Sequence, residues 1–427
     1  LLDAPVAGEL RHRPGGALLL DAESGELAAV GSADQLRRRY PNEGRWPRPE
    51  GGRLLAVPGL IDTHAHLPQL PAVARREESL LPWLERHIFP LERSFRGGAS
   101  QRPFIEAFFD EVVRNGTSTI VLYSAIWEDS TELAFEVAEQ KGIRAVIGKV
   151  MMDEGSYGEA DPAQARALSV TECRRLIEKW HGAANGRIDF VVSPRFAVSC
   201  SMPLMQEAAE LARKHGTYIQ THLSESGLEI ETVRERFPGM TYTEVYDRAG
   251  LLTERTLLGH CLHLVESEVA LIAERGARVT HCPTSNLFLR SGLFPHDELH
   301  AAGIPISLGS DVAAGPELNM WQVMRGAVEM QTARALSRGE RSEFGPTEAF
   351  HLATAGAAAA LHKSDRIGTL DEGREGDVTV IDLNRVFPLN GTWTPADLTG
   401  EQILSACVYR AQPTATVAVF VRGRQIH

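Results

Sequence analysis

The sequence predicts an α/β protein, a (β/α)8 TIM barrel with a small composite β-sandwich domain formed by the N- and C-terminal segments. Apolar runs of strand length alternate eight times with segments of helical periodicity, and eight such units close a barrel. The segments on either side of this alternation are both β-rich, so we expect the two ends of the chain to share one small sheet domain. A doubly wound open sheet is the structural alternative, and the count of eight disfavours it.

Residues 1–56 form the N-terminal part of the predicted small domain. Apolar runs at 17–20 and 27–30 flank the polar, glycine-containing stretch 21–26, which is the pattern of a β-hairpin. Residues 35–40 are expected to form one or two helical turns.

Residues 57–362 form the predicted barrel, with Pro103 and Pro203 at favourable helix starts. Its eight strands are expected at 57–61, ahead of His64, and then at 119–123, 144–150, 189–192, 218–220, 256–258, 277–280 and 304–308. The helical segments between them include 104–114, 130–140, 170–180, 203–215 and 266–274.

Residues 363–427 form the C-terminal part of the predicted small domain. Before it, the alanine-rich stretch 347–361 predicts one helix. After it, the β pattern returns at 378–381 and 417–421.

The composition is that of a globular protein, with 43% hydrophobic and 23% charged residues. The net charge of −12 argues against nucleic acid as the main partner. No apolar run approaches the ~18–20 residues of a membrane span, so we expect no membrane partner. The 5 cysteines are scattered without a CxxC pair, which suits a cytoplasmic protein with buried, reduced thiols.

His64 and His66 form an HxH pair at the end of the first predicted strand. Residues i and i+2 of a strand point to the same side, so both imidazoles can face one metal ion. The chain has 15 histidines, and chance alone gives about 0.5 such pairs in it, so the pair is weak by itself. It needs partners at other strand ends.

Metal-binding or titratable side chains do follow three later strands. His222 ends the fifth strand, with Glu225 three residues on; His260 follows the sixth, and Asp311 follows the eighth. Barrel active sites lie at the C-terminal ends of the strands. Any one of these residues is more often part of a buried hydrogen-bond network, but all of them at one end of one barrel indicate a shared site.

These residue types suit one Zn²⁺ ion, with Fe²⁺ as the alternative, and the predicted ligands are His64, His66, His222 and Asp311. Such an ion lowers the pKa of a bound water to roughly 7. The predicted catalytic residues are Glu225 as the proton carrier, His260 beside the attacked carbon and Asp311 as a proton acceptor.

Arg195 and Phe196 follow the fourth strand, and Gln69 lies three residues after the HxH pair. Two-metal barrels of this sort use a carbamylated lysine at the end of strand 4, where this chain has Arg195, so we predict one metal. An arginine, an amide and a phenyl ring can bind a planar polar heterocycle. A surface arginine beside a core phenylalanine is the alternative, and spacing alone does not choose between them.

Several motifs of this chain resemble those of the amidohydrolase superfamily. They are PGLIDTHAH, THLSE, GHCLHL, HCPTSN, LGSD and IGTLDEGREGDVTVID. Within that superfamily the chain is similar to the guanine deaminase family. The motifs that carry this narrower resemblance are HAHLPQ, LPWLERHIFPLE at 81–92, GKVMMD at 148–153, SPRF at 193–196 and HCPTSNLFLRSGLF at 281–294.

The resemblance implies that guanine and water are converted to xanthine and ammonia by a cytosolic, zinc-dependent homodimer. It implies zinc at the four ligands predicted above, and catalysis by Glu225. The implied guanine contacts are Gln69, Arg195, Phe196, His222 and Glu225, with His260 and Asp311 beside the reacting carbon.

Two other functions stay open at this point. A mononuclear amidohydrolase could deaminate another amino-heterocycle, such as a pterin, cytosine or a triazine. A non-catalytic barrel could serve as a scaffold, although every ligand and the proton carrier are present. The cytidine-deaminase type of zinc enzyme is excluded, because the chain lacks the HxE…PCxxC signature.

Overall fold

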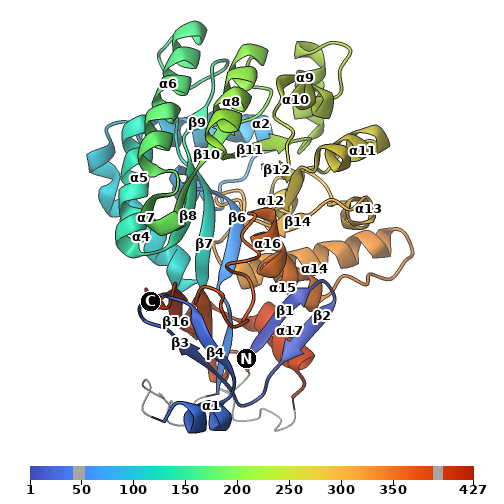
Figure 1. Ribbon diagram of the computed structural model, residues 1–427. Coiled ribbons are helices and arrows are strands. Elements are labelled where there is room, and N and C mark those ends of the chain that lie inside the picture. Colours follow the sequence, from blue (N-terminus) through green and yellow to red (C-terminus); the bar gives the residue numbers. More distant parts are fainter. Residues whose placement is uncertain (42–52, 388–397) are drawn as a thin grey trace. The chain divides into compact units, whose positions relative to one another are not determined.

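The computed structural model describes residues 1–41, 53–387 and 398–427 (Figure 1). The chain forms two compact units. One contains Leu1–Asp62, Asp110–Thr119 and Leu318–His427, and the other contains Thr63–Phe109 and Ile120–Glu317. We retain residues 1–56, 57–362 and 363–427 as our proposed domain ranges.

Eight strands follow one another in chain order around a nearly closed barrel, as predicted. They are β6 (Leu60–His66), β7 (Thr117–Tyr123), β8 (Arg144–Gly148), β10 (Ile188–Pro194), β11 (Tyr218–Leu223), β12 (Thr256–His260), β13 (Arg278–His281) and β14 (Ile306–Leu308). Neighbours from β8 to β14 pair in parallel, and the short β9 (Val150–Met151) also pairs with β10.

The first and last strands meet through hydrogen bonds. The Thr63 hydroxyl donates to the Leu308 carbonyl (2.9 Å), and it lies 2.8 Å from the Ser307 hydroxyl. The backbone N–H of Asp311 donates to the carbonyl of His64 (2.8 Å). These contacts bring the residues after β14 next to the histidines of β6.

The predicted helices alternate with the strands along the chain, as can be followed in Figure 1. They are α4 (Arg102–Arg114), α5 (Glu128–Lys141), α6 (Pro162–Trp180), α8 (Met202–His215) and α11 (Glu266–Arg275). Ser201 caps α8 through the N–H of Leu204, and Gly142 and Gly216 end α5 and α8 with positive φ angles of 80° and 68°. Further helices are α7 (Ala183–Gly186), α9 (Gly227–Arg236), α10 (Tyr242–Ala249), α12 (Pro283–Phe288) and α13 (His296–Ala301).

The segment after β6 is helical, which our sequence analysis did not predict. It contains a 3-10 helix (Leu67–Ala72), α2 (Leu80–Trp83), a π-helical turn (Leu84–Ile88) and α3 (Phe89–Arg93). Single π-helical turns occur frequently at functional sites.

The small sheet combines both ends of the chain. Strand β5 (Leu54–Pro58) pairs antiparallel with β15 (Val378–Asp382), followed by β16 (Thr416–Val421) and β17 (Arg424–Gln425). The predicted hairpin is also present as β3 (Gly16–Leu20) and β4 (Leu27–Ser32). Apolar side chains of this hairpin pack with those of the four-stranded sheet, which confirms a composite β domain.

The remaining elements of this unit include a hairpin that we did not predict, β1 (Leu2–Val6) with β2 (Glu9–His12). Its helices are α1 (Ala33–Arg39), α14 (Met320–Ser337), α15 (Pro346–Leu352), α16 (Ala355–Ala360) and α17 (Gly400–Arg410).

The prediction of one helix over 347–361 is wrong, because the chain breaks at Ala353–Thr354 between α15 and α16. The Ala353 carbonyl accepts a hydrogen bond from the N–H of Ile61 (2.9 Å), and Thr354 leaves the helical region with φ −135° and ψ −98°. A hydrogen bond to β6 therefore interrupts the helix here, although the local sequence has a high helix propensity.

In the described parts of the chain, no helix has the length and apolar character needed to cross a bilayer. All five cysteines are buried, as the sequence predicted, and none of them forms a disulfide bond.

Candidate active site and metal centre

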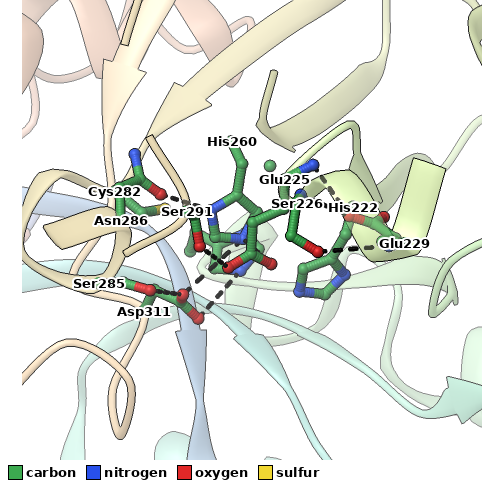
Figure 2. Close-up of polar contacts among 12 residues, drawn as sticks. His222, Glu225, Ser226, Glu229, His260, Cys282, Ser285, Asn286, Ser291 and Asp311 are labelled. Atoms are coloured by element: carbon green, nitrogen blue, oxygen red, sulfur yellow. Dashed lines mark hydrogen bonds and ion pairs between the residues drawn. The ribbon is translucent and has the colours of Figure 1, made fainter. Parts of the chain in front are cut away.

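The predicted ligands and catalytic residues lie together at the C-terminal ends of four strands. Figure 2 shows four of them, His222, Glu225, His260 and Asp311. His64 and His66 lie at the C-terminal end of β6, His222 is the second-to-last residue of β11, and His260 is the last residue of β12. Asp311 and Glu225 follow β14 and β11. All six side chains belong to the second compact unit and are buried.

The four predicted ligands direct their polar atoms toward one point. Asp311 Oδ1 lies 3.2 Å from His66 Nε2 and 3.4 Å from His64 Nε2. His66 Nε2 lies 3.2 Å from His222 Nε2. Burial lowers the pKa of His66 to about 4, and burial with the neighbouring His64 holds the pKa of His222 well below its usual value. Neutral imidazoles are the form that binds metals.

A second grouping overlaps with the first. His64, His222, His260 and Asp311 each offer a ligand atom within 4.8 Å of the others. Three imidazoles and one carboxylate are a donor set for a single divalent ion with room for a water. In both groupings the shared residues are His64, His222 and Asp311, so the site fits one metal.

Asp311 divides its two carboxylate oxygens between different partners. Oδ1 faces His64 and His66, whereas Oδ2 accepts from the Ser285 hydroxyl (2.6 Å) and lies 3.8 Å from His260 Nε2. The carboxylate thus contacts the predicted ligands with one oxygen and the predicted catalytic histidine with the other.

Glu225 lies beside this centre and is held on both sides of its carboxyl group. Oε1 accepts from the Ser291 hydroxyl (3.0 Å), and Oε2 lies 3.3 Å from His260 Nε2. Burial, together with the charge of Asp311, raises the pKa of Glu225 to about 8. This carboxyl group can therefore hold a proton at neutral pH and release it to a substrate.

The backbone of Glu225 is fixed by Glu229 at the start of α9. Glu229 Oε2 accepts from the N–H groups of Glu225 (2.9 Å) and Ser226 (3.1 Å), and its Oε1 accepts from the Tyr242 hydroxyl (2.8 Å). Together with Ser226 it forms a capping box. The predicted proton carrier is thereby held at the N-terminus of α9.

Three polar residues after β13 support the site, and our sequence analysis assigned them no role. Ser285 donates to Asp311, Ser291 donates to Glu225, and Asn286 Oδ1 accepts from His260 Nδ1 (2.9 Å). The proton of His260 is then on Nδ1, and Nε2 faces the centre. The available signal was a cluster of short polar side chains directly after the seventh strand.

A cavity brings the predicted substrate-binding residues next to the metal centre. Its lining residues are His66, Gln69, Leu80, Trp83, Leu84, Arg195, Phe196, His222, Glu225, His260, Leu289, Asp311 and Ala314. The apolar members pack in one cluster with Ala72 and Ile88, which keeps water away from the polar groups. Gln69, Arg195 and Phe196 are therefore part of this cavity, and the surface alternative for Arg195 is wrong, since its side chain is only 3% exposed.

Glu92 is the principal residue that the sequence analysis missed. It is completely buried and contacts both Gln69 Nε2 (2.8 Å) and Arg195 Nη1 (2.7 Å). Lys149 follows β8 and forms an ion pair with Glu172 (3.1 Å). It is not among the residues that line the cavity. It takes no part in the metal centre.

Residues 55–426 match the Amidohydrolase family. The chain belongs to this family. The resemblance to this family that the motifs indicated is thus confirmed.

The relatives most similar in sequence include guanine deaminases of distant organisms. That of Dictyostelium discoideum is 32% identical over 378 residues, which are 88% of this chain and 83% of that protein. That of Escherichia coli is 33% identical over 380 residues, covering 88% of this chain and 83% of its own.

Solved structures agree with this grouping. A guanine deaminase from C. acetobutylicum with bound guanine aligns with a TM-score of 0.90 and 26% identity over 100% of this chain and 98% of its own. The E. coli enzyme aligns with a TM-score of 0.87 and 31% identity over 98% of this chain and 94% of its own. A zinc-containing chlorohydrolase at 22% identity shares the fold.

The contact between Ser285 and Asp311 gives a prediction about metal affinity. We expect Ser285→Ala to weaken metal binding by about 10–100-fold, because a ligand carboxylate loses the donor that orients it. Competition with a chelator measures this. Ser337→Ala, which removes a hydroxyl bonded to the Arg334 carbonyl in α14, is the control. Equal metal affinity in both variants would contradict the prediction.

Proposed function

We propose that this protein is a guanine deaminase that converts guanine and water to xanthine and ammonia. The observation that carries the proposal is the cavity, in which Gln69, Arg195 and Phe196 lie beside the imidazole and carboxylate centre. The relatives that share most of the chain and bear this activity in their names support the same substrate.

The cavity offers complementary groups to a purine. The Arg195 guanidinium and the Gln69 amide can hydrogen-bond the polar edge of the ring. The Phe196 ring, whose centroid lies 6.4 Å from that of His222, offers an apolar face for stacking. These groups would hold the amino-bearing carbon of guanine against Glu225, His260 and Asp311.

We propose zinc as the metal, one ion per chain, held by His64, His66, His222 and Asp311, with Fe²⁺ as the alternative. When bound, the ion would supply a water with a pKa lowered to roughly 7. Asp311 would accept the proton of the attacking water, and its Oδ2 lies 3.8 Å from His260 Nε2, which lies 3.3 Å from Glu225 Oε2. Glu225 would then give a proton to the ring nitrogen beside the attacked carbon. The proton of the added hydroxyl group would pass to the amino group, which would leave as ammonia while the carbonyl of xanthine forms.

Deamination of a pterin, cytosine or a triazine is not favoured. The triazine hydrolases among the solved structures share only 20–22% identity with this chain, which shows the common fold alone. The scaffold alternative is disfavoured too, since all the groups needed for hydrolysis lie in one buried site.

Ammonia release from guanine tests the proposed function directly. We expect turnover of guanine by protein that carries about one metal ion per chain, and loss of turnover after chelation. Elemental analysis distinguishes zinc from iron. Turnover of cytosine, a pterin or a triazine with guanine inert would replace this proposal by the alternative.

Glu225→Gln separates the proton carrier from the metal ligands. We expect kcat to fall by about 10²–10⁴-fold, because the amide cannot carry the proton, while the metal content stays at the wild-type level. The same assay with elemental analysis measures both. Loss of metal in this variant would show that Glu225 is a ligand.

We further propose that the protein is a homodimer in the cytoplasm, where it acts in purine catabolism or salvage. The family resemblance supports this assignment. Light scattering of the purified protein should give twice the chain mass, and a monomer mass would contradict the dimer.

A further inference from the structure

We infer that Glu92 is a positioning residue that sets the hydrogen-bonding face of the substrate cavity, an inference that rests on the proposed guanine site. Glu92 lies in α3 and is 0% exposed. Its Oε1 accepts from Gln69 Nε2 (2.8 Å), and its Oε2 accepts from Arg195 Nη1 (2.7 Å). One carboxylate therefore joins two substrate-binding side chains that follow different strands, β6 and β10.

The first consequence concerns the amide of Gln69. An ionised carboxylate only accepts hydrogen bonds, so Gln69 must present its NH₂ group to Glu92. Its Oε1 is then on the opposite side of the amide, as an acceptor. The Arg195 guanidinium has five N–H donors, of which one serves Glu92. Glu92 thus orients Gln69 Oε1 as an acceptor and the remaining Arg195 N–H groups as donors. Guanine carries an N–H next to a carbonyl on its ring edge, which these two groups complement.

The second consequence concerns charge. Arg195 is buried, and Glu92 is its ion-pair partner at 2.7 Å. The pair leaves no net charge in this part of the cavity, so it suits a neutral purine. Without the carboxylate, Arg195 would be a buried cation without this partner and would favour an anionic ligand.

The backbone of Glu92 is held by a further contact, since its carbonyl accepts from Trp127 Nε1 (3.0 Å). Phe89 of the same helix contacts Arg195 too, with its ring centroid 5.2 Å from Cζ. The helix α3 therefore contacts Arg195 through both Glu92 and Phe89.

Glu92→Gln tests this inference by steady-state kinetics with guanine. We expect KM to rise by about tenfold or more, with a smaller change in kcat and an unchanged metal content. Inhibition by urate, an anionic purine, should strengthen relative to inhibition by hypoxanthine, a neutral one. Glu159→Gln, which removes the carboxylate of an exposed pair with Arg96 (3.3 Å), is the matched control.

Glu92→Asp keeps the charge but shortens the side chain, so it cannot reach both partners. We expect the KM of this variant for guanine to rise as well. Thermal unfolding shows whether Glu92→Gln folds, and if it does not, Glu92→Asp takes its place. A wild-type KM in either variant, or an unchanged urate-to-hypoxanthine ratio in Glu92→Gln, would overturn the inference. Wild-type protein that releases no ammonia from guanine would overturn the proposed function instead.

Discussion

Asp311 is the residue on which both the barrel and its polar centre depend. The backbone N–H of Asp311 donates to the carbonyl of His64, and this hydrogen bond connects the residues after the last strand to the first strand. Its side chain then contacts His64 and His66 with one oxygen and approaches His260 with the other. The same residue therefore connects the first and last strands and contributes to the site. A shift of Asp311 would change both the contact between these strands and the geometry of the site.

Around this point, the buried polar groups are held by a further layer of short side chains. Ser285, Asn286 and Ser291 each bond one group of the centre, and Glu229 bonds the backbone that carries Glu225. Buried polar groups without partners are costly, whereas satisfied ones fix a single geometry. The layer therefore stabilises the protein and orients its reactive groups at the same time.

The eight strands and the residues that follow them were predictable, because apolar runs mark buried strands and active sites of barrels lie at their C-terminal ends. That rule located His222, His260 and Asp311 from local patterns alone. Glu92 was not predictable in this way, since its role depends on how a helical loop folds back onto Gln69 and Arg195. The break at Ala353 was missed for a similar reason, because a tertiary hydrogen bond to Ile61 outweighs the helix propensity of alanine.

The buried cysteines have a consequence for the chemistry of the protein in air. Cys261 and Cys282 directly follow strands β12 and β13 beside the site, and none of the five thiols is exposed. Burial raises the pKa of Cys200 and Cys407 to about 12, and thiolates are the form that oxidants and alkylating reagents attack. The folded protein is therefore resistant to both. The rate at which a thiol reagent labels each cysteine would report how often the structure around that cysteine opens.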